Sequence, residues 1–177
     1  LDKVILITGA GGSIGSELCQ QLIILGVSKI ILVDNSEYNL YEIEKKLKSI
    51  TSSSKTEKKI ITCLNSIQNY ASINNLFKLH EPDIVYHVAA FKHVNMIENN
   101  IINAIENNFL ASCNLIDLAV KYKSEEFILV STDKAVEPTS IMGSTKRMAE
   151  TYIQVISQSN PSTKLSIVRF GNVINSS

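Results

Sequence analysis

The chain has few cysteines and histidines and no long apolar run, features typical of disulfide-bonded secreted proteins, metal-binding proteins and membrane proteins. Its three cysteines, Cys19, Cys63 and Cys113, are an odd and scattered set, which argues against a disulfide framework and is typical of reduced cysteines in a cytosolic protein. The longest apolar stretch, LIILGVSKIILV, is interrupted by Ser28 and Lys29 and is shorter than the roughly 20 residues of a membrane span. Histidine, cysteine and carboxylate residues nowhere show the spacing of a metal site.

Neither positive nor negative charge is in excess. Seventeen basic residues balance seventeen acidic ones, so no global field attracts nucleic acid or an anionic membrane. Any anionic ligand must then be held by local groups. We therefore expect a small molecule, and no nucleic acid, as the partner.

The 177 residues are 45% hydrophobic and 19% charged, which is enough apolar material for one buried core. Short β-branched runs alternate with longer segments of helical period, the pattern of a parallel sheet flanked by helices. Strands are predicted at 3–9, 29–34, 59–64, 83–90, 126–132 and 164–170, and helices near 14–25, 40–50, 73–79, 103–122 and 141–159. A polar loop is expected at 51–59, and Pro161 should stop the last helix. The predicted fold class is α/β, a Rossmann-type doubly wound parallel sheet with helices on both faces, forming one domain over 1–177.

The glycine loop TGAGGSIG lies between the first predicted strand and the first predicted helix. Gly9 permits the tight turn, Gly12 lets backbone approach a pyrophosphate, and Gly15 lets the helix pack on the strand. Ser13 and Ile14 begin the helix, whose N-terminus faces the phosphates. The loop in this context predicts dinucleotide binding, although three glycines by themselves also serve ordinary turns.

Asp34 ends the second predicted strand, about 20 residues after the loop, where a carboxylate accepts hydrogen bonds from an adenosine ribose. A ribose 2′-phosphate would meet this negative charge, and no arginine follows in DNSEYN. The cofactor is therefore expected to be NAD. The alternative is that Asp34 caps the next helix.

The other strands should bring polar side chains to the same edge, because ligands bind outside the carboxyl ends of parallel strands. These ends are Asn65-Ser66-Ile67, Ala89-Ala90-Phe91-Lys92-His93, Ser131-Thr132-Asp133-Lys134 and Phe170-Gly171-Asn172. The small Ala89 and Ala90 would let a cofactor approach backbone. His80 and His87 are interpreted as structural, whereas for His93 a place in the pocket and a place outside it both stay open.

The stretch IMGSTKRMAE, 141–150, presents a puzzle. Met142 and Lys146 are four residues apart, so on a helix they share one face. A lysine in this position is typical of a catalytic pair whose other member is tyrosine. Met142 cannot move a proton, so the acid–base chemistry must lie elsewhere or be lost.

Five strings in order give the chain a specific resemblance: ITGAGGSIGSELC, DNSEYNLYEIE, FKHVNMIENN, STDKAVEPTSIMGSTKRMAE and RFGNV. They resemble the extended short-chain dehydrogenase/reductases that modify nucleotide sugars. Within these, the chain is most similar to the UDP-N-acetylglucosamine 4,6-dehydratases, the CapD-like polysaccharide biosynthesis proteins. The Met-x-x-x-Lys variant of the usual Tyr-x-x-x-Lys pair occurs in that branch.

The resemblance assigns the catalytic roles. Lys146 would bind the nicotinamide ribose, and Thr132 would bond O4 of the sugar. Asp133 would be the acid that protonates the departing hydroxyl. Lys134, which replaces the more usual glutamate, would be the base that removes the C5 proton, provided that its pKa is lowered. Met142 would occupy the place of the tyrosine.

The resemblance also implies the remaining contacts. Asn108 would steady the active site from the fourth predicted helix, 103–122, and contact the cofactor. Lys92 would contact cofactor and substrate, and His93 beside it would contact the substrate. Asn172 would contact the substrate. Ser66 and Ile67 would contact the adenine, although Asn65 before them departs from the family's glycine.

The implied reaction is an internal redox cycle on UDP-N-acetylglucosamine: hydride leaves C4, water is lost across C5–C6, and hydride returns to C6. The product is a 4-keto-6-deoxy sugar for polysaccharide or glycan synthesis, and the enzyme is a lyase. Two alternatives are a nucleotide-sugar 4-epimerase, which needs no acid to expel the C6 hydroxyl, and a noncatalytic NAD-binding module. Asp133 and Lys134 argue against the epimerase. Lys146 and the string Thr132-Asp133-Lys134 argue against the noncatalytic module.

The chain begins at Leu1 within a few residues of a strand and stops soon after one, so we expect a piece of a longer protein whose C-terminal substrate-binding part is missing. In the family that part holds the uridine and much of the sugar. Alone, the chain is expected to bind NAD weakly or not at all and to turn over no substrate. The longer protein is expected to be a cytoplasmic homo-oligomer, with an anchor in the inner membrane as an option.

Overall fold

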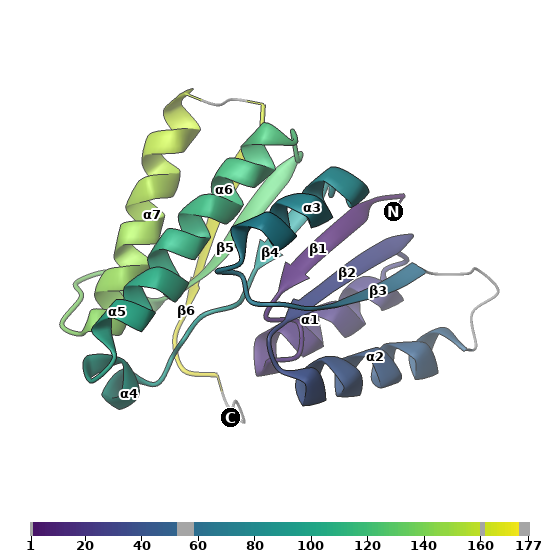
Figure 1. The fold of residues 1–177 in the computed structure, drawn as a ribbon, viewed down its shortest axis with the longest axis horizontal. Coiled ribbons are helices and arrows are strands. Elements are labelled where there is room, and N and C mark those ends of the chain that lie inside the picture. Colours follow the sequence, from purple (N-terminus) through teal and green to yellow (C-terminus); the bar gives the residue numbers. More distant parts are fainter. Residues whose placement is uncertain (1, 53–58, 160–161, 174–177) are drawn as a thin grey trace.

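Six parallel strands form one sheet in the computed structural model, which describes residues 2–52, 59–159 and 162–173 (Figure 1). The strands are β1 (Val4–Thr8), β2 (Lys29–Asp34), β3 (Lys59–Leu64), β4 (Ile84–His87), β5 (Glu126–Thr132) and β6 (Lys164–Phe170). Their order across the sheet is β3-β2-β1-β4-β5-β6. The strand order reverses between β1 and β4, which makes the gap between their carboxyl ends the expected ligand site.

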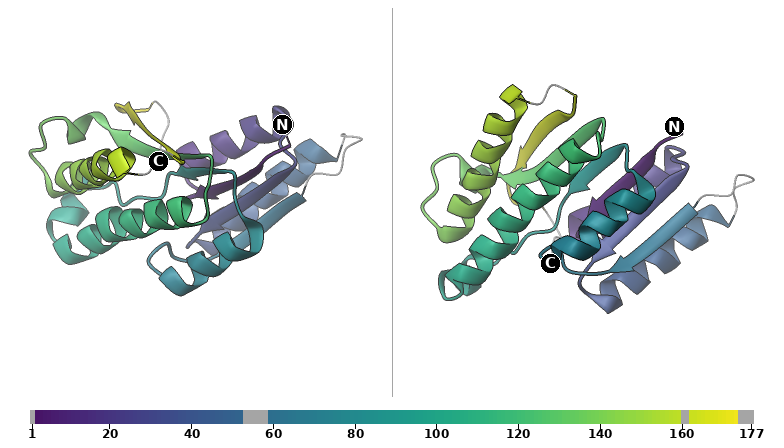
Figure 2. Two further views of the ribbon diagram at one scale, coloured as in Figure 1. Left: turned by 90° about the horizontal axis from the view of Figure 1, so that it is seen from above. Right: turned by 45° about the horizontal axis from the view of Figure 1, so that its top comes forward.

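Helices cover both faces of this sheet. The α-helices are α1 (Ser13–Ile24), α2 (Glu37–Thr51), α3 (Tyr70–His80), α4 (Val94–Glu98), α5 (Ile101–Ala104), α6 (Ala111–Lys121) and α7 (Ile141–Ser159). A π-helix, η1 (Ile105–Leu110), joins α5 to α6, and a 3₁₀ turn, η2 (Asp133–Ala135), follows β5. The turned views show α1 and α2 on one side of the sheet and α3, α6 and α7 on the other (Figure 2). The predicted doubly wound α/β fold is confirmed.

Successive side chains along a strand point to opposite faces of the sheet, and two hydrophobic cores result, one on each face. Ile5 and Ile7 of β1 face α1 and α2 together with Ile30 and Leu32 of β2. Leu6, between them, lies in the other core, against α3, α6 and α7. All these side chains are buried, as expected for parallel strands covered on both faces.

Two predicted elements differ from the structure. The fourth strand was expected over 83–90 but ends at His87, and the chain then runs along the carboxyl edge of the sheet. The helix expected over 103–122 begins at Ile101, and its first turns change to π-helix from Ile105 to Leu110. The five-residue helix α4 was not predicted, because so short a segment shows no period. Pro161 and most of the predicted loop 51–59 lie outside the described residues.

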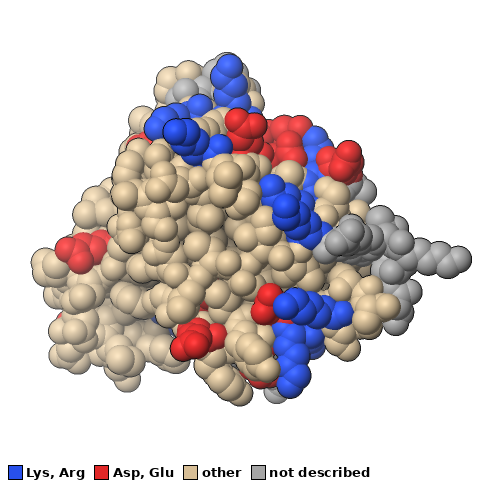
Figure 3. All heavy atoms as spheres, turned by 45° about the vertical axis from the view of Figure 1, so that its right-hand side comes forward, with Lys and Arg blue, Asp and Glu red and all other residues tan. Residues whose placement is uncertain are grey.

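Two surface features bear on partners. On the face shown in Figure 3, Lys and Arg side chains lie beside Asp and Glu side chains, and a broad central area is uncharged. None of the helices in the described parts of the chain is both long and apolar enough to cross a membrane. Those same parts contain no group of three or more metal-ligating side chains.

Candidate active site

A cleft of about 760 Å³ opens at the carboxyl ends of the strands. It extends from the glycine loop after β1, past the ends of β2 and β4, to the ends of β5 and β6. Most of the predicted site residues line it: Gly9, Gly12, Ser13, Ile14, Asp34, Ser66, Ile67, Ala89, Ala90, Lys92, His93, Thr132, Lys134, Met142, Lys146 and Asn172. The structure thus brings together residues from the whole length of the sequence.

Three predicted site residues do not line the cleft. Gly15 lies beneath the glycine loop, Asn108 is fully buried behind the cleft wall, and the Asp133 side chain is 58% exposed at its edge. His93 does line it, which answers the question that the sequence left open. Residues that the sequence did not mark, among them Met96, Asn100, Asn103 and Asn107, also line it. They lie on α4, before and on α5, and on the π-helix, and no strand-end rule points to these helices.

The glycine loop has the geometry that a pyrophosphate requires. Gly9 has a φ of +67°, a conformation that favours glycine, and a Cβ on Gly15 would lie 2.0 Å from the Gly9 carbonyl oxygen. A Cβ on Gly12 would meet nothing closer than 3.4 Å. Gly12 is the N-cap of α1 and has no side chain to cover the first-turn N–H groups. The N-terminus of α1 can therefore receive an anion.

Asp34 is 8% exposed and binds backbone on both of its oxygens. One accepts a hydrogen bond from Gly11 N at 2.9 Å, and the other accepts one from Ser36 N at 2.9 Å. The side chain of Ser36, and not that of Asp34, caps α2 by accepting from Asn39 N. The capping alternative is therefore wrong, and Asp34 ties the glycine loop to β2 at the floor of the cleft.

Lys146 is the most unusual group in the site. It is 4% exposed, lines the cleft, and its Nζ has no hydrogen-bond partner. Burial lowers the pKa of Lys146 to about 8, although the Glu150 carboxylate opposes the shift. Met142 lies one turn earlier and packs on Ile97 and Ala104. A buried amine without a partner is costly, so a ligand that accepts its hydrogen bonds would fit here.

These features fit a dinucleotide. The glycine loop and the N-terminus of α1 can receive an anion on one side of the cleft, and Lys146 of α7 lines the same cleft. Thr163 carries the second buried polar atom without a partner among the described residues, but it does not line the cleft. The unpaired amine thus belongs to a residue that lines the cleft, and its contact with a cofactor ribose stays a prediction.

A polar chain connects the ends of β5 and β6. The Thr132 hydroxyl donates to Asp133 Oδ1 at 2.9 Å and accepts from Lys134 N at 3.3 Å. Lys134 Nζ donates to Asp133 Oδ1 at 3.2 Å and to Asn172 Oδ1 at 3.1 Å. The hydrogen bond from Thr132, followed by that from Lys134, holds the pKa of Asp133 below its ordinary value. The expected acid and base therefore form an ion pair in this arrangement.

His87 has a structural place, as the sequence suggested. It is fully buried, and burial together with the charge of Lys146 lowers its pKa to about 3. Its Nε2 lies 2.7 Å from the Ser112 hydroxyl, which donates to the Asn108 carbonyl at 2.8 Å. Ser112 must then accept from His87, so Nδ1 is the acceptor for the Thr8 hydroxyl at 2.7 Å. This neutral relay links β1, β4 and the π-helix.

Asn108 supports the cleft wall through the backbone of the segment after β4. Its Oδ1 accepts from Phe91 N at 2.8 Å, and its Nδ2 donates to the Phe91 carbonyl at 2.9 Å. Nδ2 also reaches the Thr145 hydroxyl at 3.4 Å, one residue before Lys146. Asn108 thus acts on the site through its neighbours, and a direct contact with cofactor stays a prediction.

Comparison with known proteins gives one family. Residues 5–177 match the family model described as polysaccharide biosynthesis protein. The chain is 42% identical to the capsular polysaccharide biosynthesis protein CapD of Staphylococcus aureus and 39% identical to the probable polysaccharide biosynthesis protein EpsC of Bacillus subtilis. These matches cover 99% and 98% of the chain, but only 29% and 28% of the relatives. A UDP-glucose 4-epimerase of Rickettsia canadensis is 30% identical over 98% of the chain and 50% of its own length.

Solved structures agree with this fold. Pen from Bacillus thuringiensis superposes with a TM-score of 0.87 at 30% identity, over 99% of this chain and 52% of that one. A Thermus thermophilus UDP-glucose 4-epimerase in complex with NAD superposes with a TM-score of 0.76 at 22% identity, over 93% of this chain and 54% of its own. The chain therefore spans about half, or less, of the proteins that it matches.

Proposed function

Since the chain belongs to the polysaccharide biosynthesis protein family, we propose that its protein modifies nucleotide sugars, as an NAD-dependent 4,6-dehydratase of UDP-N-acetylglucosamine. One observation carries the reaction type. Met142 faces the cleft one turn before the unpaired amine of Lys146, while an acid and a base stand at the end of β5. Met142 has no proton to transfer, whereas Asp133 and Lys134 at the end of β5 offer two proton-transferring groups.

The glycine loop, Ala89 and Ala90 would bind the cofactor, with Asp34 toward the adenosine ribose. Bound NAD would supply a reversible hydride acceptor. Lys146 would donate to the nicotinamide ribose and, while charged, stabilise negative charge on the C4 oxygen. Because Met142 is apolar and 6% exposed, it would exclude water at this point without taking a proton.

Thr132, Asp133 and Lys134 would carry the elimination. The carboxyl of Asp133 must be protonated to donate to the departing C6 hydroxyl, and Lys134 must be neutral to take the C5 proton. Both conditions require that their mutual ion pair separates. A substrate hydroxyl that takes the place of Lys134 and Thr132 beside Asp133 would raise the carboxyl pKa, because it removes the donors that stabilise the charged form.

Lys92, His93 and Asn172 would hold the UDP-sugar at the open side of the cleft. Asn172 already accepts a hydrogen bond from Lys134 at 3.1 Å, so substrate binding there is coupled to release of the base. His93 is the N-cap of α4, at the beginning of the segment that faces the cleft with Met96. We expect these side chains to govern substrate affinity more than the rate of chemistry.

A 4-epimerase is the second candidate function, and the 30% identity to the Rickettsia canadensis UDP-glucose 4-epimerase favours it. An epimerase also oxidises C4 but needs no acid at C6. The ion pair of Asp133 and Lys134 would then have no catalytic task. Met142 argues against epimerisation that depends on a tyrosine at this position.

Identification of the product tests the proposal. The full-length protein is incubated with UDP-N-acetylglucosamine and NAD, and the sugar is followed by NMR. A 4-keto-6-deoxy sugar with a new C6 methyl signal is the expected outcome. A C4 epimer as the sole product would sink the dehydratase assignment and leave the epimerase.

A further inference from the structure

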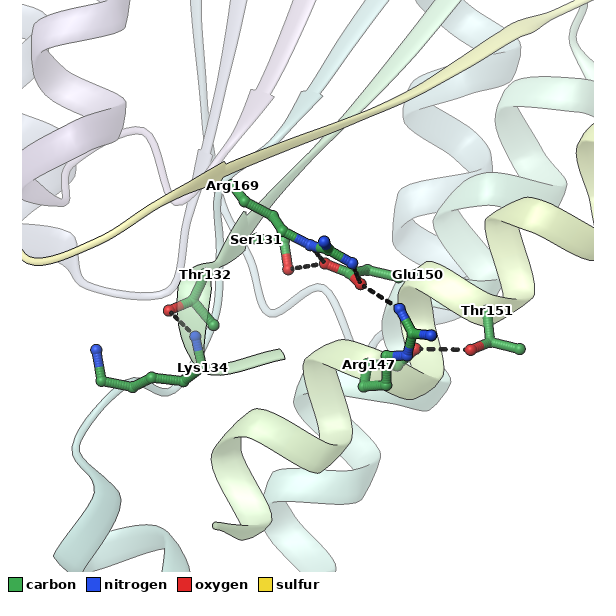
Figure 4. Close-up of polar contacts among 7 residues, drawn as sticks. All are labelled: Ser131, Thr132, Lys134, Arg147, Glu150, Thr151 and Arg169. Atoms are coloured by element: carbon green, nitrogen blue, oxygen red, sulfur yellow. Dashed lines mark hydrogen bonds and ion pairs between the residues drawn. The ribbon is translucent and has the colours of Figure 1, made fainter. Parts of the chain in front are cut away.

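A buried carboxylate behind the cleft has no part in the roles assigned above. Glu150 of α7 is fully buried, one helical turn after Lys146. Figure 4 shows its side chain pointing from α7 toward the sheet, between Ser131 of β5 and Arg169 of β6. Each of these three elements also carries expected site residues on the side facing the cleft.

Both carboxylate oxygens of Glu150 accept hydrogen bonds from neighbouring side chains. Oε1 accepts from the Ser131 hydroxyl at 2.6 Å and from Arg169 Nε at 2.8 Å. Oε2 accepts from Arg169 Nη2 at 2.5 Å, and Arg147 Nη1 lies at 3.4 Å. The paired contact from Arg169 is the planar, two-bond geometry that arginine makes with carboxylates. We call Glu150, Arg169 and Ser131 the carboxylate clamp.

The clamp explains why Lys146 has no partner. A lysine and a glutamate four residues later share one helix face and can form an ion pair, although the reverse order is more favourable. Here Arg169 from the neighbouring strand pairs with that carboxylate instead, and the Lys146 amine has no hydrogen-bond partner. We propose that Glu150 and Arg169 are positioning residues that keep Lys146 free for the cofactor and substrate by occupying its helix counterion.

The charges around Lys146 are consistent with this role. Glu150 on α7 is the charged group that acts on the Lys146 pKa, and His87 on β4, whose own pKa is lowered by burial and by Lys146, stays neutral. Arg169 on β6 and the partly exposed Arg147 on α7 both contact Glu150. Burial acts to raise the pKa of Glu150, but hydrogen bonds from Arg169 and then Ser131 outweigh it and keep the carboxylate charged. The same carboxylate, although engaged by Arg169, still raises the pKa of Lys146 against the larger effect of burial. Removal of Arg169 would leave the buried Glu150 carboxylate with two cations of the same helix, the 42% exposed Arg147 and the buried Lys146.

This inference rests on the proposed cofactor role of Lys146, and three variants of the full-length protein test it. The readouts are the Lys146 pKa, from NMR titration of ¹³Cε-labelled lysine assigned with Lys146→Met, and the NAD affinity from calorimetry. Arg169→Met should raise the Lys146 pKa by about one unit or more and weaken NAD about tenfold, as the freed carboxylate recruits the amine. Glu150→Gln should lower the Lys146 pKa below about 8, because the carboxylate that supports the charge is gone. Glu150→Gln/Arg169→Met should return the pKa to the wild-type value or below and recover NAD affinity.

Lys164→Met is the matched control. It also removes a cation of β6 from an ion pair with a glutamate, Glu126, but far from the cleft on the exposed end of the strand. It should leave both readouts at wild-type values.

The proposal is overturned if Arg169→Met behaves like this control, if Glu150→Gln does not lower the Lys146 pKa, or if the double variant is as impaired as Arg169→Met. Glu150→Gln preserves shape, so a poorly folded Arg169→Met protein does not block the test. All readouts are taken without substrate, so a protein that yields only the epimer would overturn the dehydratase assignment and leave this inference standing.

Discussion

At the scale of single residues, the site depends on two groups held in unusual states. Lys146 is a buried amine with no hydrogen-bond partner, and its pKa is lowered to about 8. Asp133 is an exposed carboxyl whose pKa is lowered by Thr132 and Lys134. The unpaired Lys146 amine is suited to a ligand that accepts hydrogen bonds. The Asp133 carboxyl must become protonated before it can act as an acid.

The pH dependence of kcat/KM should reveal the deprotonation of Lys146. Because burial lowers the pKa of Lys146 to about 8, the positive charge that we propose to stabilise the C4 oxygen is present below that pH and lost above it. We expect kcat/KM to fall above about pH 8. Lys146→Met should lower kcat/KM and lack this alkaline limb, in steady-state rates measured from pH 6 to 10. An unchanged alkaline limb in the variant would assign it to another group.

Asp133→Asn should slow dehydration about 10²- to 10⁴-fold, the usual contribution of a general acid. The loss should fall on kcat, because the proposed proton donation to the departing hydroxyl stabilises the transition state and not the bound substrate. Glu137→Gln is the matched control, since it removes a nearby exposed carboxylate of the same segment. Equal rates for Asp133→Asn and the control would remove Asp133 from the mechanism.

The sequence predicted the residues of the cleft better than their interactions. The rule of carboxyl strand ends found Thr132, Lys134 and Asn172, because chain order and strand direction fix which side chains meet there. The clamp was not predicted, because Glu150 in a helical pattern resembles a surface residue. Its burial depends on Arg169, nineteen residues away on another element, and a pattern along one chain does not show such pairs.

At the scale of elements, the glycine loop and the segment after β4 set the two walls of the cofactor region. Strands and long helices were well predicted, because buried β-branched runs and helical periods span many residues. The elements missed were the short α4 and the π-helix. Glu98 at the end of α4 accepts a hydrogen bond from Ile141 N at the start of α7, a tertiary contact that helps place α7 beside the cleft.

Two glycines of the loop should respond differently to alanine. Gly15→Ala places a Cβ 2.0 Å from the Gly9 carbonyl oxygen, so both thermal stability and NAD binding should suffer. Gly12→Ala makes only a 3.4 Å contact, so the protein should keep its stability while NAD binding weakens, because the methyl group occupies the approach to the pyrophosphate. Thermal unfolding and calorimetry on both variants measure this. Full NAD affinity in Gly12→Ala would contradict the assigned role of the loop.

Asn108→Leu should destabilise the protein by about 1–3 kcal/mol, because it leaves the N–H and carbonyl of Phe91 without their partner. Asn99→Leu, at an exposed position of the neighbouring segment, should stay within about 0.5 kcal/mol of wild type. Urea unfolding with unchanged slope measures both. Equal stabilities would show that Asn108 does not support the cleft wall.

At the scale of the whole molecule, the described part of the chain forms a cleft at the carboxyl ends of the strands and a sheet with β6 at one edge. It spans 29% of CapD and 28% of EpsC. We expect the 177-residue chain by itself to yield no product from UDP-N-acetylglucosamine, whereas the full-length protein turns it over. Parallel assays at equal concentration check this, and turnover by the chain alone would show that the cleft described here suffices.

The most direct test of the dehydratase assignment follows one atom. UDP-N-acetylglucosamine with deuterium at C4 is incubated with the full-length protein, and the label is located by NMR. Oxidation at C4, loss of water across C5–C6 and return of hydride predict a 4-keto product with deuterium at C6. Deuterium retained at C4 of an epimerised sugar would contradict the account.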